Sequence, residues 1–232
     1  MARQPDSSQT YDTPDQALHA TDQFYQQRQG FEYTEQYVVD WLREFVTLPK
    51  RGRVLDLCCG DGIWSKGIAA INPDLELFGV DISQGGIEKA RQLLNTDEHH
   101  FLVADAEAEL PFPDAHFDMI FARGPGLYNQ HAMDRPATIG VIERWHDKLT
   151  PAGRCWSLFA SNPRHMGTYT PAENVKLPYN QCPRRTETVD FRGGKYHHGI
   201  ESFLAPFFKA RNVEIRDYAF RRNNHILVTR RV

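Results

Sequence analysis

Four carboxylates in the first half of this chain have the spacing of a ligand site: Asp56, Asp61, Asp81 and Asp105. Asp56 lies in an apolar run that predicts a buried strand, and Asp61 lies in the turn that follows, between Gly60 and Gly62. In open α/β sheets, ligands bind beyond the carboxyl ends of the strands. Acids at this edge would repel a pyrophosphate and attract a cationic ligand.

The same acids favour S-adenosylmethionine over a nicotinamide dinucleotide. Asp81 follows Asp56 by 25 residues, the spacing at which a carboxylate accepts ribose hydroxyls in either kind of site. Asp105 can accept a hydrogen bond from an adenine amino group. Asp56 decides between them, because dinucleotide folds normally have a small or apolar residue there, and Ser65 stands in place of the third fingerprint glycine. A nicotinamide-dependent oxidoreductase is therefore the disfavoured alternative.

The elements that must position these acids alternate between strands and helices. Apolar runs predict strands over residues 53–57, 75–81, 99–104, 117–122, 154–160, 213–220 and 226–231. Helical spacing predicts helices over 62–71, 85–94 and 200–208, and one through Ile139, Ile142, Trp145 and Leu149 that ends at Pro151. Strands joined by helices must pair in parallel, and the last two, joined by a short link, must pair antiparallel. We expect an α/β, Rossmann-like, doubly wound, mostly parallel sheet with helices on both faces and one reversed C-terminal strand at its edge.

The chain divides by composition. Residues 1–14 are polar and predict a disordered tail. Residues 15–232 are expected to form a single domain, in which residues 15–50 make a helical N-terminal cap of two helices linked at Gly30. Residues 161–198 are rich in proline and lack periodicity, so we expect an irregular insertion that acts as a substrate lid.

Composition narrows the class of protein. With 232 residues, 41% hydrophobic side chains and a net charge of -3, the chain suits one soluble globular domain, and nucleic acid is an unlikely partner. No apolar run is long enough to cross a bilayer and the polar start lacks the apolar core of a signal peptide, so we expect a cytoplasmic monomer or homodimer. The cysteines have no metal-ligand spacing, so neither a metal site nor a disulfide framework is expected.

Taken together, these residues resemble the class I S-adenosylmethionine-dependent methyltransferases, in the small single-domain group that acts largely on small molecules. The resemblance covers about residues 35–232 and rests on the segments 54–62, 79–83, 105–106 and 110–118. It implies that S-adenosylmethionine is bound by Asp56, Cys58, Gly60, Gly62, Asp81, Ile82, Asp105, Ala106 and Arg123. Cys58 departs from the family, which has the first glycine of its loop there. A small side chain suffices if the contact is through the backbone; the alternative is a protein that has lost cofactor binding.

Methyl transfer needs alignment more than acid–base groups, because the donor is already activated. A weakly acidic hydroxyl or a protonated amine would still need a base, and the candidates are His131 and His197. Arg123 could contact the cofactor through its backbone, bind a substrate carboxylate, or simply pack in its loop. The sequence after it lacks the motif of base N-methyltransferases. Side chains expected to line an aromatic acceptor pocket, or else to cover the end of the sheet, are Tyr25, Tyr33, Tyr128 and Tyr169.

The sequence therefore predicts an enzyme that methylates an oxygen or nitrogen atom of a small molecule, such as a natural-product or secondary-metabolite intermediate. The alternatives are an RNA methyltransferase and a catalytically silent module that binds S-adenosylmethionine. Selectivity for the acceptor would lie in residues 15–50 and 161–198, which contain no motif that identifies it.

Overall fold

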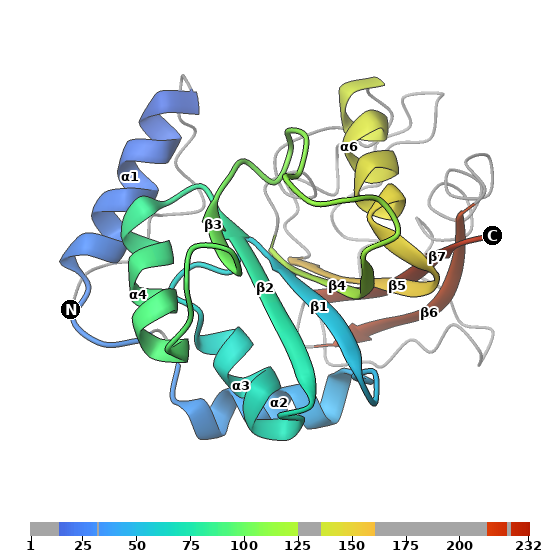
Figure 1. Ribbon diagram of the computed structural model, residues 1–232, viewed down its shortest axis with the longest axis horizontal. Coiled ribbons are helices and arrows are strands. Elements are labelled where there is room, and N and C mark those ends of the chain that lie inside the picture. Colours follow the sequence, from blue (N-terminus) through green and yellow to red (C-terminus); the bar gives the residue numbers. More distant parts are fainter. Residues whose placement is uncertain (1–13, 32, 125–135, 161–212, 222–223) are drawn as a thin grey trace, which may run out of the picture. The chain divides into compact units, whose positions relative to one another are not determined.

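The computed structural model describes residues 14–31, 33–124, 136–160, 213–221 and 224–232 (Figure 1). It divides into two compact units, residues 1–106 and 107–232, which are described separately. The expected tail, apart from Pro14, and the expected lid over 161–198 lie outside the described residues, as does the helix predicted over 200–208. The single domain over 15–232 stays a prediction. No helix in the described segments is long and apolar enough to cross a membrane.

Three parallel strands form the sheet of the first unit. They are β1 (Gly52–Leu57), β2 (Leu75–Asp81) and β3 (Phe101–Val103), in the order β3-β2-β1. The register pairs Leu57 with Val80 and Asp81 with Val103, so the carboxyl ends of these strands meet at one edge. The strand predicted over 75–81 is confirmed to the residue. β3 is shorter than predicted, because Asp97 accepts the backbone N–H of His99 and closes a turn there.

Helices α3 (Ile63–Ile71) and α4 (Gln84–Leu94) follow β1 and β2 and pack on this sheet. The predicted cap at Ser83 is confirmed, since its hydroxyl oxygen accepts the backbone N–H of Gly86 at 3.0 Å. Beneath α4 lies an apolar cluster that consists of Cys59, Ile87, Ala90 and Phe101, with Leu77 and Leu94 at its margin. This core fixes the start of α4 beside the end of β2.

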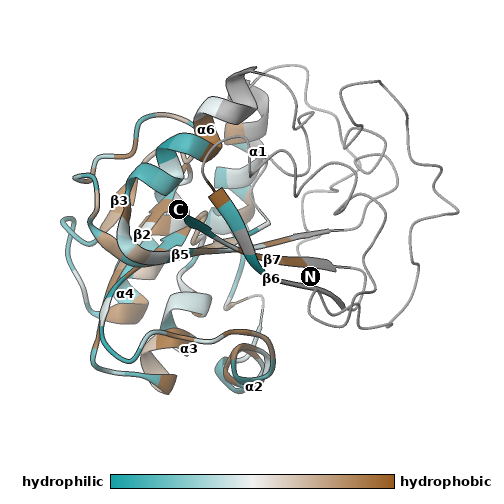
Figure 2. Ribbon diagram, turned by 90° about the vertical axis from the view of Figure 1, so that its right-hand side faces the viewer, coloured by the Kyte–Doolittle hydropathy of each residue, from teal (hydrophilic) through white to brown (hydrophobic). Residues whose placement is uncertain are grey.

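Two further helices pack on α3 and α4: α1 (Pro14–Gln27) packs on α4, and α2 (Glu35–Phe45) packs on α3 (Figure 1). The two helices predicted for the N-terminal cap are confirmed, and Gly30 in their link has a φ of 80°. α2 contains both hydrophobic and hydrophilic residues (Figure 2) and buries Val38, Val39 and Leu42. Val38 and Leu42 lie against Gly67 of α3, where an added Cβ would come within 2.5 Å of Val38 Cγ1.

The second unit contains α6 (Pro136–Asp147) and the strands β4 (Phe117–Arg123), β5 (Leu149–Ala160), β6 (Val213–Arg221) and β7 (Asn224–Arg231). Its strand order is β4-β5-β7-β6: β4 and β5 are parallel, and β7 is antiparallel to both of its neighbours. The predicted antiparallel C-terminal pair is confirmed. The reversed strand is β7, which lies one position inside β6 and not at the edge as expected.

The prediction that one helix runs through Leu149 and ends at Pro151 was wrong. α6 ends at Asp147, and Leu149 begins β5, where it pairs with Phe117. The carbonyl of Lys148 accepts the backbone N–H groups of His116 and Phe117, both at 2.9 Å, which commits the chain to the sheet. Pro151 falls where the β4–β5 register shifts, so its missing N–H costs no regular ladder bond.

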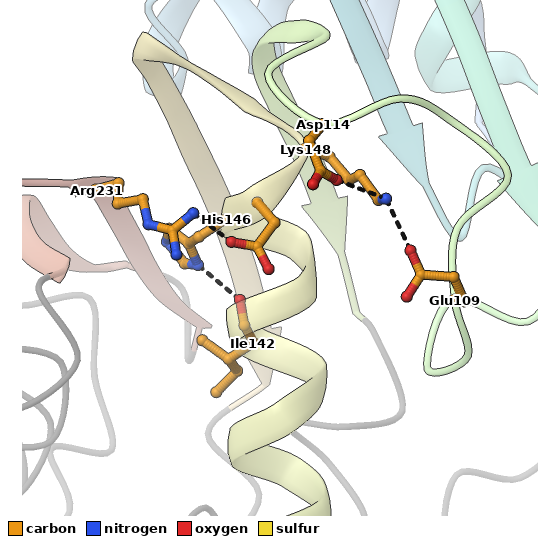
Figure 3. A network of polar contacts seen from close by, with 7 residues as sticks. Glu109, Asp114, Ile142, His146, Lys148 and Arg231 are labelled. Atoms are coloured by element: carbon orange, nitrogen blue, oxygen red, sulfur yellow. Dashed lines mark hydrogen bonds and ion pairs between the residues drawn. The ribbon is translucent and has the colours of Figure 1, made fainter.

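Figure 3 shows the polar contacts of His146, near the end of α6, and of Lys148, which precedes β5. His146 Nδ1 donates to the carbonyl of Ile142 at 2.8 Å, and Nε2 lies 2.9 Å from the hydroxyl oxygen of Thr229, whose proton it accepts in the neutral ring. This arrangement needs the neutral imidazole, and burial lowers the pKa of His146 to about 4. The ammonium of Lys148 is also buried and bonds Glu109 and Asp114.

Candidate functional site

The chain leaves β1 through a turn that has three residues in the left-handed region. Cys58, Gly60 and Gly62 have φ values of 63°, 55° and 78°. Glycine adopts this conformation readily, whereas cysteine does so at a cost of about 1–2 kcal/mol. The backbone N–H of Cys59 donates to Val80 of β2 at 3.0 Å, which holds the turn beside the end of the second strand.

Asp81 ends β2 and connects the glycine turn to the start of α4. Its Oδ2 accepts the N–H of Gly60 at 2.9 Å, and its Oδ1 accepts the N–H of Ser83, also at 2.9 Å. The carboxylate is buried, and this burial raises its pKa. A carboxylate oxygen can accept more than one hydrogen bond, so both oxygens retain capacity for hydroxyl groups of a ligand. The predicted ribose acid thus lies directly against the predicted glycine turn.

Asp56 has a partner that the sequence did not suggest. The hydroxyl of Ser65 on α3 donates to its Oδ2 at 2.5 Å, and both side chains are buried. The pKa of the buried Cys59 thiol is raised well above its usual range, by desolvation and then by the charges of Asp56 and Asp81. The hydrogen bonds of Asp56 and Asp81 place two carboxylates beside the turn, and carboxylates favour a cationic ligand over an anionic one. Direct contact between Asp56 and a ligand stays a prediction.

Two apolar side chains are exposed at the carboxyl ends of β2 and β3. Ile82 is 39% exposed and Val103 is 44% exposed. The N–H of Ala104 donates to the carbonyl of Asp81 at 3.0 Å, so the segment leading to Asp105 is tied to the end of β2. Asp105 is exposed and the next residue, Ala106, is buried. Exposed apolar side chains and an acid at the ends of neighbouring strands suit a flat heterocycle that carries an amino group.

Tyr25 of α1 lies against the glycine turn. A Cβ added to Gly60 would come within 2.1 Å of the Tyr25 hydroxyl oxygen, and one added to Gly86 would come within 3.3 Å of the Tyr25 ring. Glycine at position 60 is thus required both by its positive φ and by this close approach. Tyr25 was predicted to bind substrate, and that role stays a prediction. One of the residues it contacts, Gly60, was predicted to bind the cofactor.

Asp22 and Lys89 join this cluster, and sequence analysis did not select either. Asp22 Oδ1 accepts the Ser83 hydroxyl and the Gly85 N–H, and Lys89 donates to the carbonyl of Tyr25. Asp22 lies three residues before Tyr25, so a shared helix face was the one available signal. Nothing in the sequence indicated which element that face would contact.

The remaining predicted residues are not brought to this cluster by the described contacts. Tyr33 stacks on Tyr37 at 5.1 Å between ring centroids and makes a T-shaped contact with Trp64. Arg123 ends β4 in the second unit, and its contact with a cofactor stays a prediction. Outside the described residues lie His131, His197, Tyr128 and Tyr169. No group of metal-ligating side chains occurs among the described residues.

Residues 54–153 match the model of a family described as a methyltransferase domain. A demethylmenaquinone methyltransferase of Bacillus licheniformis is 30% identical over 129 residues, which are 55% of this chain and 53% of the relative. A protein of the same name from Geobacillus kaustophilus is 32% identical over 129 residues, 53% of this chain and 51% of the relative. This chain thus spans about half the length of the curated relatives that it matches.

Two solved structures show the same fold at low identity. An S-adenosylmethionine-dependent methyltransferase from Mesorhizobium loti aligns with a TM-score of 0.56 and 16% identity over 87% of this chain and all of the other. An O-methyltransferase from neocarzinostatin biosynthesis, in complex with S-adenosylmethionine and 2-hydroxy-5-methyl naphthoic acid, aligns with a TM-score of 0.53 and 15% identity over 85% of this chain and 56% of the other. The predicted Rossmann-like α/β fold is confirmed.

Proposed function

We propose that residues 54–153, which match the model of a methyltransferase domain, belong to the class I S-adenosylmethionine-dependent family and that the protein transfers a methyl group to an oxygen or nitrogen atom of a small molecule. The observation that carries the proposal is the pair of hydrogen bonds from Gly60 and Ser83 to Asp81. They orient a buried carboxylate at the glycine turn, with capacity left for ribose hydroxyls.

The residues of this edge fit S-adenosylmethionine. Ile82 and Val103 offer apolar contact to an adenine ring, and Asp105 offers an acceptor for its amino group. Ala106 follows as a small, buried residue. Gly60 and Gly62 let Tyr25 and Ala90 approach the turn closely, and the carboxylates of Asp56 and Asp81 lie beside it. A cationic sulfonium is favoured in such surroundings, whereas a pyrophosphate is not.

S-adenosylmethionine supplies a methyl group that is already activated by its positive sulfur. The protein's own contribution is to bind, orient and exclude water, which is where most of the rate enhancement of such a transfer arises. Asp81 fixes the ribose, and Tyr25 closes the turn at Gly60. Any proton that the acceptor must lose would be taken by a base, for which His131 and His197 remain the candidates. Arg123 is proposed to contact the cofactor through its backbone.

The relatives named demethylmenaquinone methyltransferases support a small-molecule acceptor over RNA. The net charge of -3 also favours this class, because phosphate neutralisation usually requires an excess of basic residues. The proposed acceptor-binding residues stay Tyr25, Tyr33, Tyr128 and Tyr169.

A labelling experiment tests the proposal. Purified protein is incubated with S-adenosylmethionine that carries a deuterated methyl group. Total RNA or a small-molecule extract, both prepared from one cell culture, is added as the acceptor. Mass spectrometry should find the label in the small-molecule fraction. Label in RNA alone would support the RNA methyltransferase. Calorimetric binding without transfer to either fraction would support the silent module, and no binding would exclude the cofactor. Asp81→Asn is the loss-of-binding variant, and Asp74→Asn, in an exposed turn, is its matched control.

A further inference from the structure

Helices α1 and α4 exchange caps. Asp22 of α1 lies at the N-terminus of α4, where its Oδ1 accepts the Ser83 hydroxyl at 2.8 Å and the Gly85 N–H at 2.9 Å. These two bonds, that from Gly85 first, lower the pKa of Asp22. A carboxylate is stabilised at this position because the first N–H groups of a helix have no partner within the helix. α1 thus supplies the negative charge that the start of α4 favours.

The return contact comes from Lys89 of α4. Its ammonium donates to the carbonyl of Tyr25 at 2.5 Å and to that of Arg28 at 2.7 Å, at the end of α1. The last turn of α1 contains no basic residue of its own. The cation that favours the C-terminus of this helix therefore comes from the neighbouring helix. Each helix end is thus contacted by a charge from the other helix: Asp22 precedes Tyr25 in α1, and Lys89 bonds the carbonyls of Tyr25 and Arg28.

Tyr25 connects this exchange to the glycine turn. Its hydroxyl lies against Gly60, and its ring lies against Gly86. Ser83 makes a second connection: its hydroxyl donates to Asp22, and its backbone N–H donates to Asp81. The turn therefore contacts α1 directly, and the proposed ribose acid is connected to α1 through Ser83.

We propose that Asp22 and Lys89 are positioning residues for the cofactor: by exchanging caps they hold Tyr25 at Gly60, so that docking of α1 and binding of S-adenosylmethionine strengthen each other. This inference rests on the proposed function, because it takes S-adenosylmethionine as the ligand of the turn. The coupling is reciprocal. Anything that releases α1 weakens binding, and bound cofactor protects α1.

The test combines calorimetry with hydrogen exchange over residues 14–27. Lys89→Met and Asp22→Ala each remove one cap and keep a good helix former. Each should weaken S-adenosylmethionine binding roughly tenfold, the value of one charge-assisted hydrogen bond, and should speed exchange in α1. Lys89→Arg should recover part of the affinity. Lys50→Met is the matched control, since Lys50 precedes β1, at the opposite end of that strand from the turn.

Once a methyl acceptor is identified, steady-state kinetics give a second readout for the two cap variants. Their kcat at saturating cofactor should stay within about twofold of wild type while their KM for the cofactor rises, because a residue that only positions the binding site does not alter the chemistry of the bound state.

The outcomes separate the two proposals. If wild-type protein binds S-adenosylmethionine and the two cap variants bind it equally well, the coupling is overturned while the proposed function stands, even if α1 exchanges faster. If wild-type protein does not bind it, both proposals fail. Should the cap variants not fold, Tyr25→Phe keeps the ring contact and removes only the hydroxyl. Unchanged affinity in that variant, or no protection of α1 by cofactor in the wild type, would overturn the inference.

Discussion

The hydroxyl of Ser65 on α3 donates a 2.5 Å hydrogen bond to the carboxylate of Asp56 on β1, and both side chains are buried. The two residues flank the glycine turn, one in the strand before it and one in the helix after it. The bond therefore holds together the two elements between which the turn is suspended. Asp56 has this structural role whatever it contributes to ligand binding.

Ser65→Ala should lower the free energy of unfolding by about 1–3 kcal/mol, because a buried carboxylate loses a hydrogen-bond donor. Urea unfolding measures the change. A double-mutant cycle with Asp56→Asn provides the control, since two residues that act through one bond give less than additive losses. Strictly additive losses would mean that the bond contributes nothing.

Asp81→Asn should weaken the binding of S-adenosylmethionine about 10- to 100-fold, the range for hydrogen bonds to a charged group. Calorimetry measures the dissociation constant, and Asp74→Asn is the control variant, which should bind as tightly as wild type. Because burial raises the pKa of Asp81, wild-type affinity should also fall as the pH is lowered, beginning above the usual pKa of an aspartate, as the carboxylate is protonated. Affinity that is independent of pH and of Asp81 would contradict the assignment of this acid to the ribose.

Cys58→Gly should raise the stability by up to about 1 kcal/mol, because relief of left-handed strain outweighs the extra backbone entropy of glycine. Cys58→Val should lower it, since a β-branched side chain tolerates the φ of 63° poorly. Thermal unfolding of the two variants measures both effects. A glycine variant less stable than wild type would show that the Cys58 side chain makes contacts worth more than the strain.

His146 should make the protein less stable in acid. Its pKa is about 4 in the folded protein and near 6.5 in the unfolded chain, so the unfolded state binds the proton first. The contribution of neutral His146 to the free energy of unfolding is fully present above pH 6.5. It is lost as the pH falls toward 4, and the total loss is roughly 3 kcal/mol. Urea unfolding between pH 4 and 8 should show this slope. His146→Gln should reduce it, whereas His99→Gln, at an exposed site, should not. Equal slopes in all three proteins would exclude His146 as the source.

Much of the first unit could be predicted because its signals are local. Gly60 and Gly62 indicate the turn after β1, and Ser83 indicates the start of α4. β2 was predicted to the residue because an apolar run ends in a charged one. Leu149 shows the limit of this approach: its spacing suits a helix, and only the bonds from His116 and Phe117 to the carbonyl of Lys148 commit that segment to a sheet.

The sequence by itself determined the fold class, the glycine turn and the acids at the strand ends, since each depends on residues within a few positions of one another. The tertiary structure alone decided how these acids are used. Ser65 was read as a missing glycine and is the partner of Asp56. Asp22 reaches Ser83 across 61 residues of chain, and Lys89 reaches Tyr25 across 64. Such contacts depend on how helices pack after the chain has folded, and no local pattern encodes which helix end will lie beside which charge.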